Sequence, residues 1–228
     1  PLSPLLSNIM LNELDKELER RGLPFVRYAD DSMIFCKSKR AAMRVKESIT
    51  RFIENVLYLK VNKEKTVVSY VRGVKYLGYS FYVMKGKCQL TVHPKSKAKM
   101  KSRLKELTSR SNGWGYAKRK QKLKEYIRGW VGYYHLANMK RLLLVTDEWL
   151  RRRIRMCIWK AWKKAKTKVA NLIRCGINKY KAYEWGNTRK GYWRIADSPI
   201  LKRAIDNNKL RSAGYATLIG SYLEWHPK

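Results

Sequence analysis

Two adjacent carboxylates, Asp30 and Asp31, lie between two short apolar runs at residues 25–29 and 32–36. Each run has the length and composition of a β-strand, so the pattern predicts a β-hairpin with both acids at its turn. Carboxylates this close repel each other unless a cation lies between them. Hard oxygen ligands suit Mg²⁺, which protein carboxylates hold together with substrate phosphates. The pair therefore indicates metal-assisted phosphoryl transfer, and the alternative is a solvated Asp-Asp turn.

The composition indicates a folded protein with a polyanionic partner. The chain has 228 residues, 45% of them hydrophobic, and a net charge of +35. Eight Trp and fifteen Tyr are interleaved with the Lys and Arg residues. Such aromatics add stacking surfaces to the charge, which favours nucleic acid over a membrane surface. No apolar run approaches the roughly 20 residues of a membrane span, and no signal peptide is visible.

The charge is concentrated after the first third of the chain. Residues 1–64 carry twelve Lys or Arg and nine Asp or Glu, so about +32 of the net charge lies in residues 65–228. This distribution predicts a nearly neutral catalytic part followed by a nucleic-acid-binding part. The four Cys are scattered without a Cys-x-x-Cys pair, which argues against a zinc site and favours free thiols in a reducing cytosol.

Elements that would position the two acids can be predicted around them. Ser3 is a candidate N-cap of a first helix that ends at Gly22, and Ser38 is a candidate N-cap of a second helix. Residues 67–71 and 74–84 have strand-like patterns, and residues 88–92 pair back after a Lys-Gly-Lys turn. This α+β section is expected to end at Pro94. The abrupt start of the first helix suggests a fragment or one piece of a split protein.

The pattern becomes helical after Pro94. We expect helices over residues 95–110, 117–135 and 140–168, which together form a small bundle. Trp130 and Tyr134 fall on the apolar stripe of the second of these helices and are predicted to be core, whereas Tyr133 lies off that stripe. Residues 182–228, rich in Gly, Trp and Tyr, read as a small module with one helix near residues 199–207.

Several ordered motifs resemble those of group II intron reverse transcriptases and maturases. Tyr28-Ala29-Asp30-Asp31 resembles the active-site box of that family. The other matches follow in chain order. Pro1–Ile9 resembles the end of a Gln-Gly-Gly-Pro-Leu-Ser-Pro motif and the helix after it, Leu59–Thr66 a Leu-x-Leu-Asn-x-x-Lys-Thr segment, and Tyr76–Phe81 the primer grip. Ile127–Tyr134 resembles the maturase signature of the thumb, and Gly191–Arg194 and Ile219–Leu223 resemble the closing segment.

The resemblance implies an α+β fold. It would comprise a partial reverse-transcriptase palm with an antiparallel sheet and helices over residues 1–94, a helical thumb or domain X over 95–170, and a C-terminal DNA-binding module over 171–228. The fingers are missing, as is the earlier strand with a third metal-binding Asp. The optional endonuclease domain of the family is also absent.

Residue roles follow from the resemblance. Asp30 and Asp31 would bind Mg²⁺ as catalytic residues, while Tyr28 and Ala29 would contact the primer end; a packed strand aromatic is a compatible interpretation of Tyr28. Lys65 would act near the triphosphate, with a solvated lysine as an equal alternative. Gly78 and Tyr79 would hold the primer backbone, and a glycine bulge in an ordinary strand is the alternative there.

Further nucleic-acid contacts are expected on the thumb and after it. A solvated face is the usual explanation for basic runs, but uncompensated charge of this density causes self-repulsion that phosphate would relieve. We expect the basic residues among the candidates to lack acidic partners. The candidates are Lys97, Lys101, Arg103, Trp114, Tyr116, Arg128, Tyr133, Arg151, Arg152 and Arg153.

Together these features predict an RNA-directed DNA polymerase that also binds intron RNA and assists splicing, although this fragment alone is expected to be inactive. The expected partners are intron RNA, an RNA template with its DNA primer, target DNA, dNTP and the missing N-terminal fingers and palm segment, and the protein could be a homodimer. We expect a bacterial cytoplasmic protein associated with the nucleoid. The alternative function is a non-enzymatic RNA-binding maturase, and a ribosomal-type structural protein would have the charge without the ordered motifs.

Overall fold

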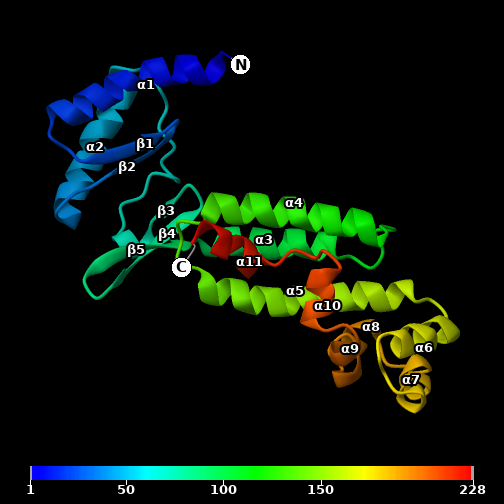
Figure 1. Ribbon diagram of the computed structural model, residues 1–228. Coiled ribbons are helices and arrows are strands. Elements are labelled where there is room, and N and C mark those ends of the chain that lie inside the picture. Colours follow the sequence, from blue (N-terminus) through cyan, green and yellow to red (C-terminus); the bar gives the residue numbers. More distant parts are fainter. Residues whose placement is uncertain (1, 227–228) are drawn as a thin grey trace. The chain divides into compact units, whose positions relative to one another are not determined.

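The computed structural model describes residues 2–226, so Pro1 of the first motif lies outside the described residues. The chain divides into two compact units, Pro1–Cys88 and Gln89–Lys228. Both units contain helices, and most of the strands belong to the first unit (Figure 1). The mixed helix and strand content agrees with the predicted α+β class. The further division of the second unit into a thumb and a C-terminal module stays a prediction.

The first unit is built from two helices and a hairpin. Helix α1 (Ser3–Arg20) and helix α2 (Lys39–Asn55) pack with the antiparallel strands β1 (Phe25–Tyr28) and β2 (Asp31–Ile34). The core of this unit holds three fully buried side chains with partly buried neighbours around them. The buried residues are Leu14, Leu18 and Ile49. Phe25 and Ile34, which are opposite each other in the hairpin, both pack on this core, so one face of the hairpin is covered and the other is open.

The two helix starts differ in how well they were predicted. Ser38 caps α2 as expected, because its hydroxyl accepts a 3.2 Å hydrogen bond from the backbone N–H of Ala41. Ser3 does not cap α1. The helix already includes Ser3, the N-cap position falls on Leu2, and no side chain caps it. Pro4 still lies in the first turn, where its missing N–H costs nothing.

A second sheet contains strands β3 (Lys75–Tyr76), β4 (Tyr79–Met84) and β5 (Lys87–Val92) in that order. The continuous strand expected over residues 74–84 is wrong, because Leu77 and Gly78 form a tight turn that pairs Tyr76 with Tyr79. Both turn residues have positive φ, 49° and 80°, a conformation typical of a two-residue hairpin. The strand expected over residues 67–71 is also absent; residues 67–70 form no regular element, and a short 3₁₀ turn, η1 (Val71–Gly73), follows them.

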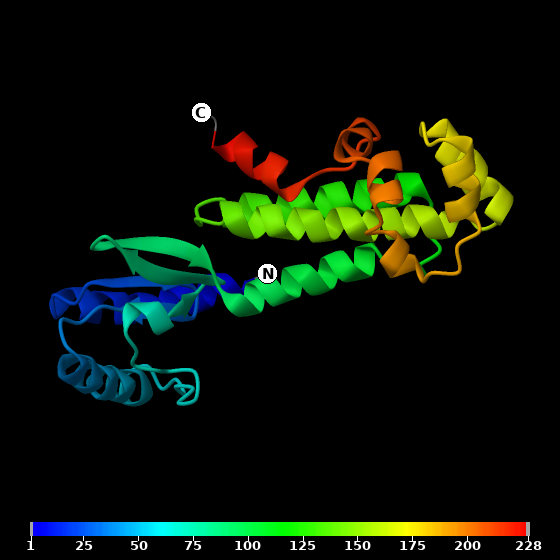
Figure 2. The same cartoon turned by 90° about the horizontal axis from the view of Figure 1, so that it is seen from below.

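The second unit begins with the predicted three-helix bundle. Helices α3 (Pro94–Leu107), α4 (Tyr116–Tyr134) and α5 (Lys140–Ala161) lie side by side, as both views of the chain show (Figures 1 and 2). Pro94 opens α3 rather than ending the preceding section, and the His93 ring accepts a 3.1 Å hydrogen bond from the backbone N–H of Lys95. Helix α5 is shorter than expected: it ends at Ala161 and does not continue to residue 168.

The bundle core is formed by aliphatic side chains at helical spacing. The most deeply buried residues are Met100, Leu104, Leu123, Ile127, Val131, Leu143, Leu150 and Ile154. Trp130 and Tyr134 are only half-buried, so the prediction that they are core is wrong. Their ring centroids lie 4.7 Å apart at the edge of the bundle. The buried stripe of α4 runs through Leu123, Ile127 and Val131, one position away from Trp130.

The remaining C-terminal part is more helical than the sequence indicated. Helices α6 (Ala165–Arg174) and α7 (Lys179–Gly186) follow the bundle. The described part of residues 182–228, where one helix was expected, contains α8 (Tyr192–Ile195), α9 (Pro199–Ala204), α10 (Asn207–Ser212) and α11 (Leu218–Trp225). Helices α6 and α7 form a close pair, where Gly186 leaves no room for a Cβ atom beside Val169. Helix α11 returns to the bundle and packs on α4 and α5 (Figure 1). The C-terminal end of the described chain is therefore part of the bundle.

Candidate nucleic-acid and metal site

The predicted hairpin forms, with Asp30 in its turn and Asp31 in the first position of β2. Tyr28 and Asp31 are opposite each other in the register, so Ala29 and Asp30 form a two-residue turn. Ala29 has a φ of +53°, in the left-handed region that an L-residue rarely adopts. All four residues are exposed, with Tyr28 66% accessible. Tyr28 is thus an open aromatic beside the acids rather than a packed strand residue.

The donor set at this turn fits a divalent cation. Among residues 2–226, neither the Asp30 nor the Asp31 carboxylate forms a hydrogen bond or an ion pair, whereas the Asp15 carboxylate on α1 is held by Arg27. Two free carboxylates in sequence are hard oxygen ligands of the kind Mg²⁺ takes with substrate phosphates. No cluster of three His, Cys, Asp or Glu that could hold a metal occurs among the described residues. This turn therefore offers two protein ligands.

Tyr76 on β3 lies next to this turn. Its hydroxyl is buried and has no hydrogen-bond partner within the described part of the chain. Burial, and then the negative charge of Asp31, raise the pKa of Tyr76, while the positive charge of Arg27 opposes the rise. The β3–β4 hairpin and the β1–β2 hairpin therefore meet near the two acids, within the first unit.

The other candidates of the first unit lie on loops and turns. Lys65 is exposed on the segment that follows α2, and its ammonium group forms no hydrogen bond or ion pair with a described residue. The loop itself is anchored, because Lys46 donates a 2.7 Å hydrogen bond to the carbonyl of Thr66. Gly78 and Tyr79 lie at the β3–β4 turn, which excludes the alternative of a bulge inside a continuous strand.

Two basic residues on α3 differ in what surrounds them. Arg103 forms a 2.7 Å ion pair with Glu106, so the expectation that it lacks an acidic partner is wrong. Lys101 lies 5.4 Å from the centre of the Trp149 ring, and Lys97 is half-buried. An exposed ion pair of this kind contributes little to stability, so the Arg103 guanidinium can exchange its partner for a phosphate.

Two of the three candidate arginines on α5, Arg152 and Arg153, are held by contacts within the protein. Arg152 lies 3.9 Å from the centre of the Trp193 ring, donates to the Trp193 carbonyl and pairs with Asp197 at 3.3 Å. Arg153 donates to the carbonyls of Lys105 and Thr108. The expectation that Arg152 lacks an acidic partner is wrong. Its guanidinium ties α5 to α8, and that of Arg153 ties α5 to the end of α3.

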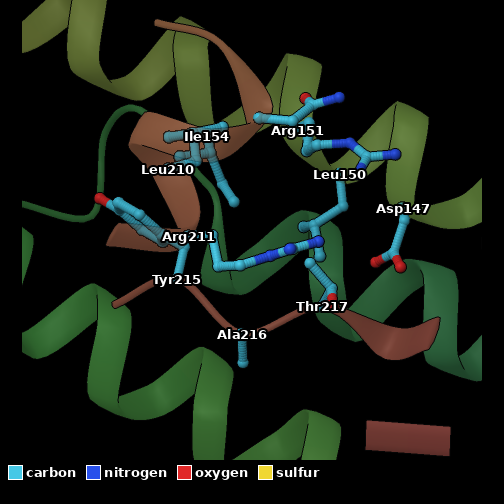
Figure 3. Close-up of a pocket in the computed structure, with 10 residues that line it drawn as sticks. Asp147, Leu150, Arg151, Ile154, Leu210, Arg211, Tyr215, Ala216 and Thr217 are labelled. Atoms are coloured by element: carbon cyan, nitrogen blue, oxygen red, sulfur yellow. The ribbon is translucent and has the colours of Figure 1, made fainter. Parts of the chain in front are cut away.

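Arg151 lines a small pocket between α5 and residues 207–217 (Figure 3). Figure 3 shows Asp147 on α5 with its carboxylate directed toward the chain near Thr217. The Asp147 oxygens accept 2.9 Å hydrogen bonds from the N–H groups of Leu218 and Ile219. Burial raises the Asp147 pKa, whereas these hydrogen bonds and the charge of Arg151 oppose the rise. The pocket measures about 10 Å³, at the lower limit for one water, so it is structural and no substrate site.

The predicted aromatic contacts on the thumb are accessible to different degrees. Tyr133 is 53% and Tyr116 43% exposed, whereas Trp114 is half-buried with Lys118 5.5 Å from its ring centre. Arg128 is exposed on α4, between Leu123 and Val131 of the buried stripe. These side chains are available to a ligand on the surface of the bundle.

Exposed tyrosines on α7 and a half-buried tyrosine on α8 were missed from the sequence. Tyr180 and Tyr183 are 80% and 53% exposed, and they are three residues apart, so both project from one side of α7. Tyr192 has two cations near its ring, Arg110 at 5.1 Å and Lys160 at 5.2 Å. The sequence signal for α7 is the Lys-Tyr-Lys-Ala-Tyr run at residues 179–183, which combines two lysines with two tyrosines that are three residues apart.

Two protein families match the chain. Residues 1–81 match the family described as reverse transcriptase (RNA-dependent DNA polymerase), and residues 97–176 match the family described as group II intron, maturase-specific domain. No curated protein matches the chain. The two matched segments lie in the order of the motifs, with Asp30 and Asp31 in the first. None of the helices in residues 2–226 has the length and apolar character needed to span a bilayer.

Proposed function

Because the chain belongs to the group II intron reverse transcriptases and maturases, we propose that the turn of the β1–β2 hairpin is its polymerase site. The observation that carries this proposal is the pair Asp30 and Asp31, exposed and without partners in residues 2–226, at a two-residue turn. These two residues would hold Mg²⁺. When bound, divalent cations stabilise the charge that develops as a primer 3′-hydroxyl attacks the α-phosphate of a dNTP.

The surrounding residues position the nucleic acid. Tyr28 shares the open face of the hairpin with Asp31 and supplies an aromatic surface for the primer end, close to the turn residue Ala29. The tight turn at Gly78 presents backbone with no side chain, which allows close approach of a sugar-phosphate strand at Tyr79. Lys65 has a free ammonium group within the described chain and is the cation we assign to the triphosphate.

The second unit is proposed to bind intron RNA and target DNA. This proposal rests on the excess positive charge, on the exposed Arg128 and Tyr133 of α4, and on the exposed tyrosines of α7. Single-stranded nucleic acid binds through such a combination of charge and stacking, and RNA loops with splayed bases use the same contacts. Binding to target DNA would place the protein at the bacterial nucleoid.

Helix α1 supports the proposal of a partner segment that completes the palm. Its first half exposes large apolar side chains at helical spacing along one stripe. These residues are Leu2, Leu5, Leu6, Ile9 and Met10, each 49–70% exposed. Apolar stripes of this width are normally buried against another element. We propose that the fingers and earlier palm strand of the family pack on it and supply a third metal-binding carboxylate.

Primer extension tests the polymerase proposal. The 228-residue chain alone should not extend a DNA primer on an RNA template with Mg²⁺, and addition of an N-terminal fingers and palm segment should restore synthesis. In the complete protein, Asp30→Asn should abolish synthesis and leave RNA affinity equal or higher, because it removes a negative charge from a basic surface. Retained synthesis by Asp30→Asn would refute the assigned site. Splicing assistance without synthesis in the wild type would favour the non-enzymatic maturase.

A further inference from the structure

Arg27, on the strand that leads into the acidic turn, joins helix α1 to that turn. Its Nε and Nη2 atoms donate to the two carboxylate oxygens of Asp15, at 2.8 and 2.5 Å. Its Nη1 atom donates to the side-chain oxygen of Asn8 and to the carbonyl oxygen of Ala29, each at 3.0 Å. One planar guanidinium thus uses three nitrogens to connect two turns of α1 with the hairpin.

This connection is sheltered from solvent. The Arg27 and Asp15 side chains are 13% and 21% exposed, whereas the Lys16–Glu13 and Arg20–Glu17 pairs of α1 each include a largely exposed member. The hydrogen bond to Asp15, opposed by burial, raises the pKa of Arg27. The geometry requires arginine, because a lysine ammonium cannot present a planar fork to a carboxylate and still reach two further acceptors.

The bond to Ala29 falls at the strained point of the turn. Ala29 has a φ of +53°, and such a backbone conformation persists only where the surrounding structure imposes it. The carbonyl that Arg27 holds belongs to the residue immediately before Asp30. The orientation of that peptide unit sets the direction in which Asp30, and then Asp31, leave the backbone.

We propose that Arg27, held by Asp15 and Asn8, is a positioning residue that imposes the left-handed turn at Ala29 and thereby directs the carboxylates of Asp30 and Asp31 toward a shared cation. This proposal rests on the function proposed above. It assigns to α1 a role beyond packing: the helix carries the two acceptors that orient the guanidinium. The buried hydroxyl of Tyr76 lies close enough to Arg27 and Asp31 for the charges of both to act on it, but it forms no hydrogen bond within the described chain.

Arg27→Lys in the complete protein is the main test. It retains the charge but loses the fork, so kcat for primer extension should fall on the order of 10–100-fold, as small misplacements of catalytic groups do. The Mg²⁺ concentration for half-maximal rate should rise, while KM for dNTP and affinity for RNA should change little. Arg20→Lys is the matched control, since Arg20 also forks onto a glutamate of α1 but does not touch the turn.

A readout without metal separates positioning from general stability. Hydrogen exchange of the peptide covering residues 25–34, measured in Mg²⁺-free buffer, should be faster in Arg27→Lys and unchanged in Arg20→Lys. Asn8→Ala removes one acceptor and leaves the ion pair intact, so it serves if Arg27→Lys does not fold. It should lower kcat and speed exchange in the same peptide with an unchanged melting temperature.

The possible results separate the two proposals. An active Asp30→Asn protein overturns the proposed function itself. An inactive Asp30→Asn protein together with wild-type kcat, Mg²⁺ dependence and exchange in folded Arg27→Lys overturns the positioning role alone. If Arg27→Lys does not fold, wild-type behaviour of Asn8→Ala has the same meaning. A double-mutant cycle of Arg27→Lys with Asp15→Asn should show non-additive losses in kcat, because both changes break one network.

Discussion

The carboxylate of Asp147 on α5 accepts a 2.9 Å hydrogen bond from the backbone N–H of Leu218, the first residue of α11. A second 2.9 Å bond comes from Ile219. A side chain from the bundle thus satisfies two of the N–H groups that every helix leaves unpaired at its start, and Thr217 caps a third at Gly220. The C-terminal helix is fixed to the bundle by a buried anion, which the helix dipole favours.

Removal of this anion should loosen α11. Asp147→Ala leaves two buried N–H groups without acceptors, at a cost on the order of 1–3 kcal/mol each. Denaturant unfolding of the purified protein would measure the change, with Glu148→Ala as the neighbouring exposed control. Equal stability of the Asp147 and Glu148 variants would contradict the structural role. Asp147→Asn should fall between, since an amide has one acceptor oxygen for two donors.

Two substitutions on α4 test where its core stripe lies. Ile127 is fully buried, so Ile127→Ala should lower stability by about 2–5 kcal/mol. Trp130 is half-buried and its ring lies beside that of Tyr134, so Trp130→Ala should cost only about 1–2 kcal/mol despite the larger side chain. Thermal melting of the two variants under identical conditions decides the order. A larger loss of stability for Trp130→Ala than for Ile127→Ala would show that Trp130 is a core residue.

Tyr215 gives a pH prediction. Burial raises its pKa to about 12, and its hydroxyl has no partner in the described chain. The folded state therefore holds this proton more tightly than the unfolded state. The resulting stability is present below about pH 10 and is lost as the pH rises toward 12. Tyr215→Phe should be neutral to about 1 kcal/mol more stable at pH 7, and should lose less stability between pH 10 and 12.

A matched control exists for this substitution. The Tyr222 hydroxyl donates a 3.2 Å hydrogen bond to the carbonyl of Ala137, so Tyr222→Phe removes a made bond and should be destabilising by about 1 kcal/mol at pH 7. Melting temperatures of both variants across the alkaline range provide the comparison. If Tyr215→Phe is as damaging as Tyr222→Phe, the Tyr215 hydroxyl has a partner after all.

Charge and stacking in nucleic-acid binding can be separated on α7. Roughly 6–10 phosphate contacts would weaken RNA binding by about 10³–10⁵ between 50 and 200 mM salt. Lys179→Ala with Lys181→Ala should lower the salt slope by about one per lysine that contacts phosphate. Tyr180→Ala with Tyr183→Ala should instead weaken binding at every salt concentration, by about 1–3 kcal/mol per stacked base, with the slope unchanged.

Titrations of intron RNA and of random RNA of equal length complete this test. The intron RNA should keep an advantage at high salt, because shape and stacked bases respond less to salt than phosphate contacts do. If the binding curves of the two RNAs coincide at every salt concentration, the chain binds RNA only as a polyanion and has no preference for the intron. Unchanged affinity of the tyrosine pair variant would remove α7 from the proposed interface.

The residues that flank Asp30 and Asp31 in the sequence were enough to predict the acidic turn. Strand-forming residues on both sides of two acids are enough to specify a two-residue hairpin, and Ser38 specifies its helix start through one hydrogen bond to its own chain. Such features depend on neighbours within a few residues, so the sequence contains all the information they need. The overall charge excess is also a property of composition and required no fold.

Tertiary structure decided the features that depend on distant partners. Leu77-Gly78 reads as part of a strand, and only the pairing of Tyr76 with Tyr79 makes it a turn. The basic run of α5 reads as free charge, yet Arg152 meets Trp193 and Asp197, which lie more than forty residues away. Whether a cation faces phosphate or its own protein depends on which surfaces the fold brings together, and helical periodicity gives no information about that.

In the candidate site, too, some features follow from the local sequence and others depend on tertiary contacts. The sequence placed Asp30 and Asp31 at a turn because both are local to the hairpin. It could not show that Arg27 reaches Asn8, Asp15 and the Ala29 carbonyl at once, because that requires α1 to lie against β1. The identity of the acidic pair is local information, whereas the direction in which the pair points depends on a contact between elements. Only the folded chain contains that contact.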